Sequence, residues 1–336
     1  MYNKHLSYLK DLKKIRKTTP IRVGTDCSGI EAPIHALQLM KIPFIHEWAC
    51  DNDNFVRQSI TCNYSPRVFY DDILSRVHKK LPKIDLYVAG FPCQTFSSLG
   101  KRMGFDDITG KGIIFFECYK TIMATTPKVF ILENVKGLTT HDRGNTFNTI
   151  LHYLESLGTY NINYQIINTQ DYGIPQNRER IYIIGTKNKK FVFPKSVILR
   201  VHIEDIIESI DKNRFLKLGE LTEHKVQLLR ELIYSGKIND LSDNWFVNLN
   251  VSAINRTGVR KDICPCLLAG EGGNCIYYLT SIRRRLTSRE YLRLQGFSDD
   301  FKICIPDRFI YKQAGNAMSV NVLCHLYMAL IQQNLL

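Results

Sequence analysis

The sequence lacks several features that define membrane, secreted and metal-binding proteins. None of its apolar runs approaches the roughly 20 residues that a bilayer-spanning helix needs. The N-terminus is rich in lysine and has no apolar segment behind it, so it is not a secretory signal. The ten cysteines include no CxxC pair, which supports neither a zinc site nor a disulfide framework. We therefore expect a cytoplasmic protein with reduced thiols, no metal and no membrane partner (nuclear in a eukaryote).

Acidic residues are in the minority. The chain has 45 Lys and Arg against 32 Asp and Glu, a net charge of +13. This balance favours a polyanionic partner, nucleic acid first, although a basic soluble protein without such a partner is the alternative. Residues 1–19 form a basic leader, expected to present a solvated helix face rather than a phosphate contact. With 336 residues and 44% hydrophobic residues, the chain is long and apolar enough for one large domain or two modest ones.

Polar or glycine residues follow three predicted strands near the start of the chain. These strands are residues 21–25, 44–50 and 68–70, and the residues after them are Ser28, Gly29 and Ile30, then Asp51, then Asp72 and Ile73. Such strand–turn–helix units bring backbone amides close to a nucleotide-type cofactor, and an acid after the second strand grips ribose hydroxyls. The alternative for Asp51 is a surface acid that caps the next helix. Together the three units indicate one cofactor cleft.

The next predicted strands carry candidates for catalysis. Residues 84–89 read as a short buried strand that ends at Gly90, and Cys93 follows on a tight loop beyond it. A lone half-buried thiol without a role is the alternative for this cysteine. Glu133 ends a buried strand, where desolvation favours a protonated carboxyl group. Helices are predicted over residues 113–124 and 146–157, and strands over 164–168 and 181–186, directly after Arg178 and Arg180.

A cysteine, a protonatable glutamate and a fixed arginine suit chemistry on a pyrimidine. A thiolate adds to carbon 6 of the ring, which then carries negative charge toward its exocyclic oxygen and nitrogen 3. A carboxyl group at nitrogen 3 and a guanidinium at the oxygen stabilise that charge. Carbon 5 becomes nucleophilic enough to accept a methyl group from a sulfonium donor.

Six short motifs resemble, in their order and spacing, those of the DNA (cytosine-5) methyltransferases of the prokaryotic or viral stand-alone type. They begin at Ser28-Gly29-Ile30, Pro92-Cys93-Gln94, Glu133-Asn134-Val135, Gln176-Asn177-Arg178-Glu179-Arg180, Arg285-Leu286-Thr287 and Gly315-Asn316-Ala317. The resemblance runs from about residue 21 to the C-terminus. Any one tripeptide occurs often by chance, but six in order do not.

The resemblance implies a role for each matched residue. Cys93 is the nucleophile, Glu133 meets nitrogen 3, Arg180 meets the cytosine oxygen, and Arg178 helps to order the site. S-adenosylmethionine is expected to contact Ser28, Gly29, Ile30, Asp51, Asp72, Ile73, Gly90 and Asn316. Duplex DNA is the expected partner of Gln94, Ser97 and Lys101, with the target base flipped out of the stack.

The implied fold class is α/β: a Rossmann-like S-adenosylmethionine-dependent methyltransferase sheet with a smaller target-recognition domain. We expect a leader over 1–19, a catalytic, cofactor-binding domain over 20–186, a target-recognition domain over 187–284, and a segment over 285–336 that returns to the catalytic domain. A monomer with a restriction-modification context is expected.

The chain departs from the family pattern mainly in the cofactor loop. Glu31 stands where the last glycine of that loop is usual, Cys27 where an aromatic residue is common, and Asn52 where an apolar residue often follows Asp51. Two alternatives keep the fold but change the function. One is a transfer RNA cytosine-5 methyltransferase, whose usual Cys-Phe-Thr tripeptide is absent from the sequence. The other is a catalytically silent DNA-binding regulator.

Overall fold

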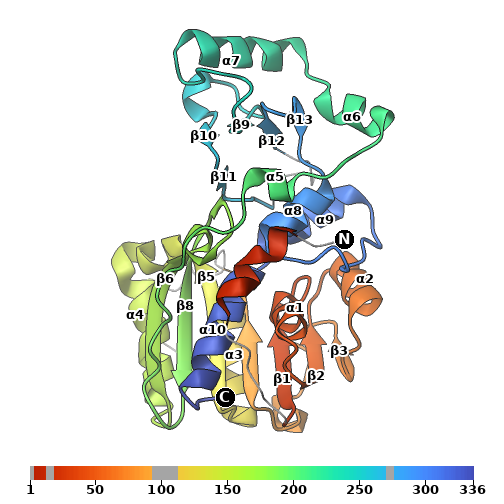
Figure 1. The fold of residues 1–336 in the computed structure, drawn as a ribbon. Helices are drawn as coiled ribbons and strands as arrows, with labels where there is room; N and C mark the ends of the chain where they lie inside the picture. The colour runs from red at the N-terminus through yellow and green to blue at the C-terminus, as the bar shows by residue number, and fades with distance from the viewer. Residues whose placement is uncertain (1–3, 13–18, 93–112, 270–275) are drawn as a thin grey trace. The chain divides into compact units, whose positions relative to one another are not determined.

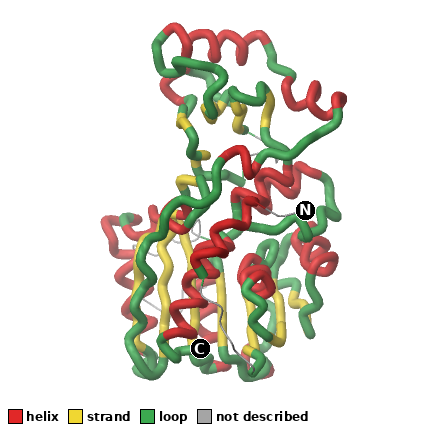
Figure 2. The backbone as a smooth tube through the Cα atoms, viewed as in Figure 1, coloured by secondary structure: helices red, strands yellow, loops and turns green. Residues whose placement is uncertain are grey.

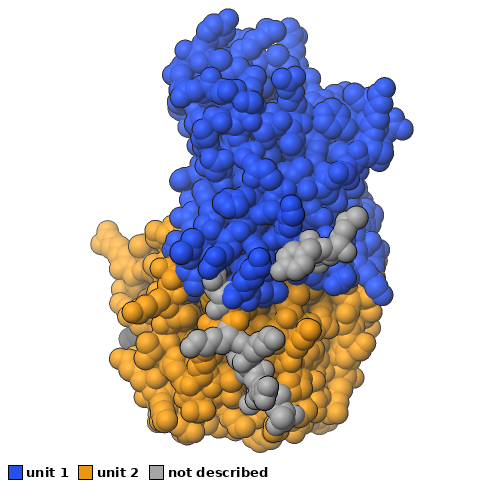
Figure 3. All heavy atoms as spheres, viewed as in Figure 1, with its two compact units in different colours: residues 1–10, 169–178, 197–317 blue, residues 11–168, 179–196, 318–336 orange. Residues whose placement is uncertain are grey.

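The computed structural model describes residues 4–12, 19–92, 113–269 and 276–336. The chain divides into two compact units, which are coloured separately in Figure 3. Unit 1 comprises Met1–Lys10, Thr169–Arg178 and Val197–Ala317, and unit 2 comprises Asp11–Asn168, Glu179–Ser196 and Met318–Leu336. The boundaries of these units differ from those of the four segments expected from the sequence. The four segments were expected as functional domains, and in that sense they stay predictions.

Unit 2 is built on a seven-stranded sheet with the order β3-β2-β1-β4-β5-β8-β6 (Figure 1). The strands are β1 (Ile21–Asp26), β2 (Phe44–Cys50), β3 (Val68–Tyr70), β4 (Leu86–Ala89), β5 (Val129–Val135), β6 (Asn161–Asn168) and β8 (Glu179–Thr186). Strands β3, β2, β1, β4 and β5 pair in parallel, and β8 pairs antiparallel with both β5 and β6. This is a Rossmann-like α/β fold, as expected.

Helices cover both faces of this sheet because its strands are apolar on both sides. The helices of unit 2 are α1 (Ala32–Leu39), α2 (Asn54–Asn63), α3 (Ile113–Thr125), α4 (Asn145–Ser156) and α10 (Val320–Gln332). α3 and α4 share one core cluster with Tyr87, Phe130 and Ile183 of the strands. α10 packs against α1, and the hydroxyl of Tyr327 donates to the carbonyl of Pro33 at 3.3 Å.

The close approach of an indole ring to β1 requires glycine at position 24. A Cβ atom on Gly24 would lie 2.2 Å from the Trp48 ring on the neighbouring strand β2. The same arrangement recurs between β5 and β8, where a Cβ on Gly185 would lie 2.1 Å from the Phe130 ring. Large aromatic side chains therefore fill the space above two glycines in the middle of the sheet.

Unit 1 has short strands and helices. Its strands form a four-stranded sheet with the order β10-β9-β12-β13 and a separate pair, β11-β7. They are β7 (Gln176–Asn177), β9 (Trp245–Asn248), β10 (Arg260–Lys261), β11 (Cys264–Pro265), β12 (Tyr277–Leu279) and β13 (Arg284–Arg285). The helices are α5 (Ile203–Ile206), α6 (Lys212–Gly219), α7 (Glu223–Tyr234), α8 (Ser288–Leu294) and α9 (Asp307–Asn316). Figure 2 shows how much of this unit is loop.

Short 3-10 helices complete both units. They are η1 (Lys4–Asp11), η2 (His78–Lys80), η5 (Lys136–Thr139), η6 (His141–Gly144), η7 (Thr169–Tyr172) and η8 (Ile254–Arg256). One of them corrects the expectation of a solvated leader. In η1, the side chains of His5 and Tyr8 are buried, and the Tyr8 hydroxyl donates to the carbonyl of Gly296 at 2.8 Å. The lysine content of residues 1–19 predicted a solvated helix and gave no sign of this buried face.

Two further findings bear on the composition. The helical stretch Asp307–Gln332 is long and apolar enough to cross a membrane, but 83% of its most apolar window is buried, as in a core helix. The free cysteines of the described part are Cys27, Cys50, Cys118, Cys264, Cys266 and Cys324.

Candidate active site

The predicted catalytic glutamate and arginine lie together on neighbouring strands of unit 2. Glu133 is in β5 and Arg180 is in β8, which are neighbouring strands (Figure 1). Their antiparallel register pairs Val135 with Arg180. Arg180 Nε lies 3.3 Å from Glu133 Oε1. Both side chains are largely buried, with 14% and 8% of their surfaces exposed. The guanidinium compensates the charge of a carboxylate that would be costly to bury alone.

Gly90 brings the end of β4 close to this pair. A Cβ atom at position 90 would lie 3.6 Å from Glu133 Oε2, 3.8 Å from the carbonyl oxygen of Cys27, and 3.0 Å from the Met318 side chain. A residue larger than glycine would therefore press on the Met318 side chain and come into van der Waals contact with the carboxyl group. Since β4 and β5 are parallel neighbours, their carboxyl ends present Gly90 and Glu133 at the same edge of the sheet.

The chain is anchored just before the predicted nucleophile. Asn134 Nδ2 donates to the carbonyl oxygen of Phe91 at 2.8 Å, and Asn134 is buried. The Asn of the predicted Glu133 motif thus fixes the backbone two residues before Cys93. Cys93 and the predicted DNA contacts lie outside the described residues, and their roles stay predictions; those contacts are Gln94, Ser97 and Lys101.

The predicted cofactor loop is a tight turn between β1 and α1. Cys27 and Gly29 have φ values of 49° and 52°, in the left-handed region that favours glycine. The amide of Ser28 donates to the carbonyl of Cys50, and the amide of Gly29 donates to Asp51 Oδ2 at 3.0 Å. Ile30 is fully buried. A Cβ atom built on Gly29 meets nothing within 4 Å, so open space adjoins this turn.

Asp51 holds this turn rather than capping the next helix. The N-cap of α2 is Asp53, whose carboxylate accepts from the amides of Phe55 and Val56. Asp51 instead accepts from the amides of Gly29 and Asp53, at 3.0 and 3.1 Å. Burial raises the pKa of Asp51 above its ordinary value, while these backbone hydrogen bonds oppose the rise. The alternative reading of Asp51 as a helix cap is therefore wrong.

The remaining predicted cofactor residues differ in environment. Asp72 Oδ1 accepts from the amide of Leu74 at 2.9 Å and is partly exposed after β3. Ile73 is 4% exposed and belongs to the core cluster below the sheet edge. Asn316 is the exposed last residue of α9 in unit 1. Their contacts with a cofactor stay predictions.

Arg178 is buried, and its guanidinium binds backbone carbonyl groups of two other segments. Its side chain is 1% exposed in unit 1. The guanidinium donates to the carbonyl oxygens of Leu267 at 3.1 Å and Ala317 at 2.7 Å. These bonds fix two segments of the same unit, which accords with an ordering role rather than direct contact with a reacting base.

A buried ion pair that was not predicted joins two segments that flank most of the predicted cofactor residues in sequence. Arg76 makes a bidentate contact with Asp26, the last residue of β1, and both side chains are almost fully buried. Asp26 also accepts from the Tyr87 hydroxyl at 2.7 Å and from the Trp48 indole at 3.0 Å. Arg76 thereby ties the segment after Asp72 to the sheet. A lone arginine in a polar stretch gives no sequence signal for such a contact.

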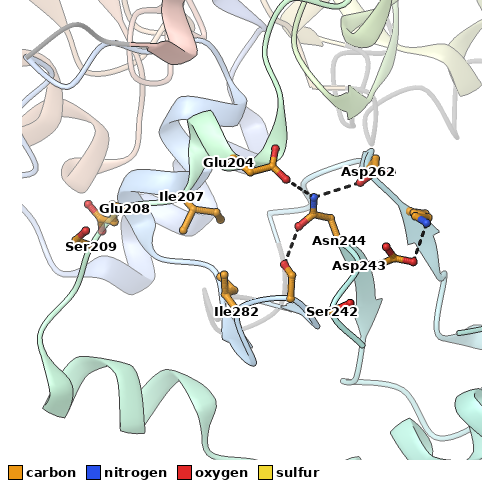
Figure 4. Close-up of a pocket in the computed structure, with 11 residues that line it drawn as sticks. Glu204, Ile207, Glu208, Ser209, Ser242, Asp243, Asn244, Asp262 and Ile282 are labelled. Carbon is orange, nitrogen blue, oxygen red and sulfur yellow. Dashed lines mark hydrogen bonds and ion pairs between the residues drawn. The ribbon is translucent and has the colours of Figure 1, made fainter. Parts of the chain in front are cut away.

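A separate polar cavity of about 630 Å³ lies in unit 1 (Figure 4). Asn244 organises its wall, since its amide donates to Glu204 at 2.7 Å and to Asp262 at 3.2 Å, and its oxygen accepts from Ser281. Of the predicted catalytic and cofactor residues that the structure describes, none lines this cavity. Within the described ranges, no group of three or more His, Cys, Asp or Glu residues could hold a metal ion.

Comparison with known proteins assigns the family. The family model for C-5 cytosine-specific DNA methylase matches residues 26–332. The chain is 38% identical over 286 residues to the type II methyltransferase M.NgoBI of Neisseria gonorrhoeae, covering 83% of each chain. It is 31% identical over 295 residues to the type II methyltransferase M.HhaI of Haemophilus parahaemolyticus, covering 84% of this chain and 85% of that one.

Solved structures share the fold at lower identity. A putative DNA modification methyltransferase encoded within an Escherichia coli prophage has a TM-score of 0.66 and 20% identity, covering 93% of this chain and 99% of that one. The Dnmt2 methyltransferase of S. pombe also has a TM-score of 0.66, with 17% identity and coverage of 94% and 99%. From the family model and the relatives, the chain belongs to the C-5 cytosine-specific DNA methylases and is a DNA (cytosine-5) methyltransferase.

Proposed function

We propose that the protein methylates carbon 5 of cytosine in a short duplex DNA sequence, using S-adenosylmethionine, a covalent Cys93–cytosine intermediate and base flipping. The observation that carries the proposal is the buried Glu133–Arg180 pair at 3.3 Å, beside Gly90 at the carboxyl edge of the sheet. The relatives' designation as type II methyltransferases supports a restriction-modification context. A cytoplasmic monomer is part of the same proposal.

Each residue has a defined task in this reaction. The Cys93 thiolate forms a bond to carbon 6 of the flipped cytosine, and the electron pair of the 5,6 double bond moves into the ring. Glu133 gives a hydrogen bond or proton at nitrogen 3, and the Arg180 guanidinium binds the exocyclic oxygen. After carbon 5 is methylated, loss of its proton restores the double bond and expels the Cys93 sulfur.

The residues around the turn after β1 suit S-adenosylmethionine, which supplies an electrophilic methyl group when bound. Open space adjoins Gly29, and the turn is held by the Asp51 carboxylate at its base. Ser28 and Ile30 belong to the same turn, and Gly90 lets the backbone approach Glu133 closely. In this proposal Asp51 and Asp72 hold the polar part of the cofactor, with Ile73 next to Asp72 in the chain. Asn316 stays a predicted cofactor contact.

Duplex DNA is the proposed substrate because of the family and the charge of +13. The proposed phosphate contacts come from Gln94, Ser97 and Lys101. Binding to non-specific duplex is therefore expected to weaken as salt rises, through counterion release.

The direct test is covalent trapping. Duplex DNA with 5-fluorocytosine at the target position should form a stable adduct with the protein and S-adenosylmethionine, because fluorine cannot leave as the carbon 5 proton does. Cys93→Ser should form no adduct while still binding DNA, since a hydroxyl is far less ionised than a thiol. The same duplex without fluorine is the control.

Transfer RNA containing 5-fluorocytosine is the second arm of this test. Adducts with the RNA alone would favour the transfer RNA methyltransferase, and adducts with neither nucleic acid would favour the silent regulator. Bisulfite sequencing of DNA from cells that express the protein would then report the recognition sequence.

A further inference from the structure

Glu31 is a buried carboxylate in the turn between β1 and α1. Its backbone has φ 59° and ψ 45°, in the left-handed region that favours glycine. Its side chain has no exposed surface. A glutamate bears two costs here, since it strains the backbone and places a charged group in the protein interior.

The carboxylate is the end of a hydrogen-bond chain that leads to the predicted cofactor loop. Glu31 Oε1 accepts from the Thr25 hydroxyl at 2.7 Å. Thr25 Oγ1 accepts in turn from the Ser28 hydroxyl at 3.0 Å. The backbone closes the same turn, because the amide of Glu31 donates to the carbonyl of Ser28 at 3.0 Å. The carboxylate of Glu31 therefore holds the Ser28 hydroxyl through Thr25, and its backbone amide holds the Ser28 carbonyl directly.

A histidine on the neighbouring strand holds the carboxylate in place. His46 Nε2 in β2 lies 3.5 Å from Glu31 Oε1 and 3.4 Å from Thr25 Oγ1. His46 is 6% exposed. Among the described residues, Glu31 Oε2 and His46 Nδ1 are buried without a hydrogen-bond partner. These unpaired atoms show that Glu31 and His46 are not optimised for stability alone.

We propose that Glu31 is a positioning residue for S-adenosylmethionine: through Thr25 it fixes the Ser28 side chain in the turn that adjoins the cofactor. The inference rests on the proposed use of this turn for the cofactor. The left-handed backbone at Glu31 aims its side chain inward at Thr25, while the Gly29 amide is fixed from the other side by Asp51 at 3.0 Å. The turn is thus held between two carboxylates, one on each side.

Glu31→Gly is the decisive variant because glycine relieves the backbone strain while removing the carboxylate. We expect the Kd of S-adenosylhomocysteine, measured by calorimetry, to rise about tenfold, as for one lost hydrogen bond to a charged group. The affinity for duplex DNA should not change. In kinetics, KM for the cofactor should rise with little change in kcat. An unchanged Kd would overturn the proposal.

Lys41→Gly is the matched control. Lys41 also has a left-handed backbone, with φ 54°, but its side chain is exposed at the end of α1. Glycine there should leave the Kd of S-adenosylhomocysteine unchanged. An equal loss of affinity in Glu31→Gly and Lys41→Gly would show that the stiffness of the backbone, and not the Glu31 carboxylate, determines cofactor binding. If the wild-type protein binds no S-adenosylhomocysteine, the proposed function fails instead of this inference.

Two further variants keep the test decisive if Glu31→Gly folds poorly. Glu31→Gln retains an oxygen that accepts from Thr25, so its Kd should stay within about threefold of wild type even where stability falls. Thr25→Val should raise the Kd as much as Glu31→Gly, and the double variant should add little more. A tenfold rise in the Kd of Glu31→Gln would contradict a relay through Thr25. Full additivity of the Thr25→Val and Glu31→Gly effects on binding free energy would contradict it as well.

Discussion

At the scale of single residues, the pair of Glu133 and Arg180 joins two strands of the central sheet through their side chains. The two residues are 47 positions apart in the chain, and Arg180 Nε lies 3.3 Å from Glu133 Oε1. The antiparallel pairing of β5 and β8 is what joins them. Motif order indicates that such residues share a site, but the register that sets their distance depends on the whole sheet.

Replacing Glu133 by glutamine should remove proton donation at nitrogen 3 while keeping the size of the side chain. We expect kcat for methyl transfer to fall by about 10²- to 10⁴-fold, the usual share of general acid catalysis. Single-turnover transfer of a labelled methyl group to duplex DNA measures this. The control is Glu155→Gln, on the exposed face of α4, which should retain full activity. A Glu133→Gln enzyme with near-normal kcat would exclude the assigned role.

The buried ion pair of Arg76 and Asp26 should contribute more to stability than an exposed ion pair does. Arg76→Met leaves a buried carboxylate without its cation, and we expect the free energy of unfolding to fall by about 3–5 kcal/mol. The comparison is Arg57→Gln, which breaks an exposed ion pair with Asp71 whose side chains are 49% and 73% exposed. This second change should cost at most about 1 kcal/mol. Urea unfolding measures both, and equal losses would contradict the argument.

At the scale of elements, strands and helices were largely predictable, whereas side-chain burial in the short segments was not. Alternating and continuous apolar runs predicted the parallel strands and the helices α3 and α4 within a few residues. The leader was misjudged because His5 and Tyr8, three positions apart, form a buried face that a count of lysines hides. The inward turn of Glu31 was equally hidden, since its partners Thr25 and His46 come from two separate strands.

Packing between β1 and β2 gives the element-scale prediction. Gly24→Ala would place a methyl group 2.2 Å from the Trp48 ring, so the strands must separate or the indole must move. We expect a loss of about 1–3 kcal/mol in the free energy of unfolding, as for an overpacked core. Gly137→Ala is the control, because a Cβ atom there meets nothing within 4 Å. Thermal unfolding should show a lower Tm for the first variant alone.

At the scale of the whole molecule, buried histidines link stability to pH. Burial lowers the pKa of His5 to about 4 and that of His35 to about 3, from an ordinary value of 6.5. Below pH 6.5 both imidazoles take up protons in the unfolded chain, whereas in the folded protein they stay neutral until the pH approaches their lowered pKa values. Stability is therefore fully present above pH 6.5 and falls as the pH drops through 4.

His5→Gln isolates one of these contributions. Its amide still donates toward the carbonyl of Phe297, as His5 does at 3.1 Å, but it takes up no proton. Between pH 7 and pH 4, the variant should lose about 3 kcal/mol less stability than the wild type. Urea midpoints across this range measure the difference. The exposed His152→Asn is the control, and a parallel decline in all three proteins would refute the role of His5.

The packing of α10 on α1 has a consequence for how the protein is made. Tyr327 of α10 bonds to Pro33, 294 positions earlier, and ten residues of α10 are buried. A ribosome must therefore add these 294 further positions after Pro33 before the helix is available to cover α1. Until then α1 keeps an apolar face uncovered, which gives chaperones time to bind unit 2 during its synthesis.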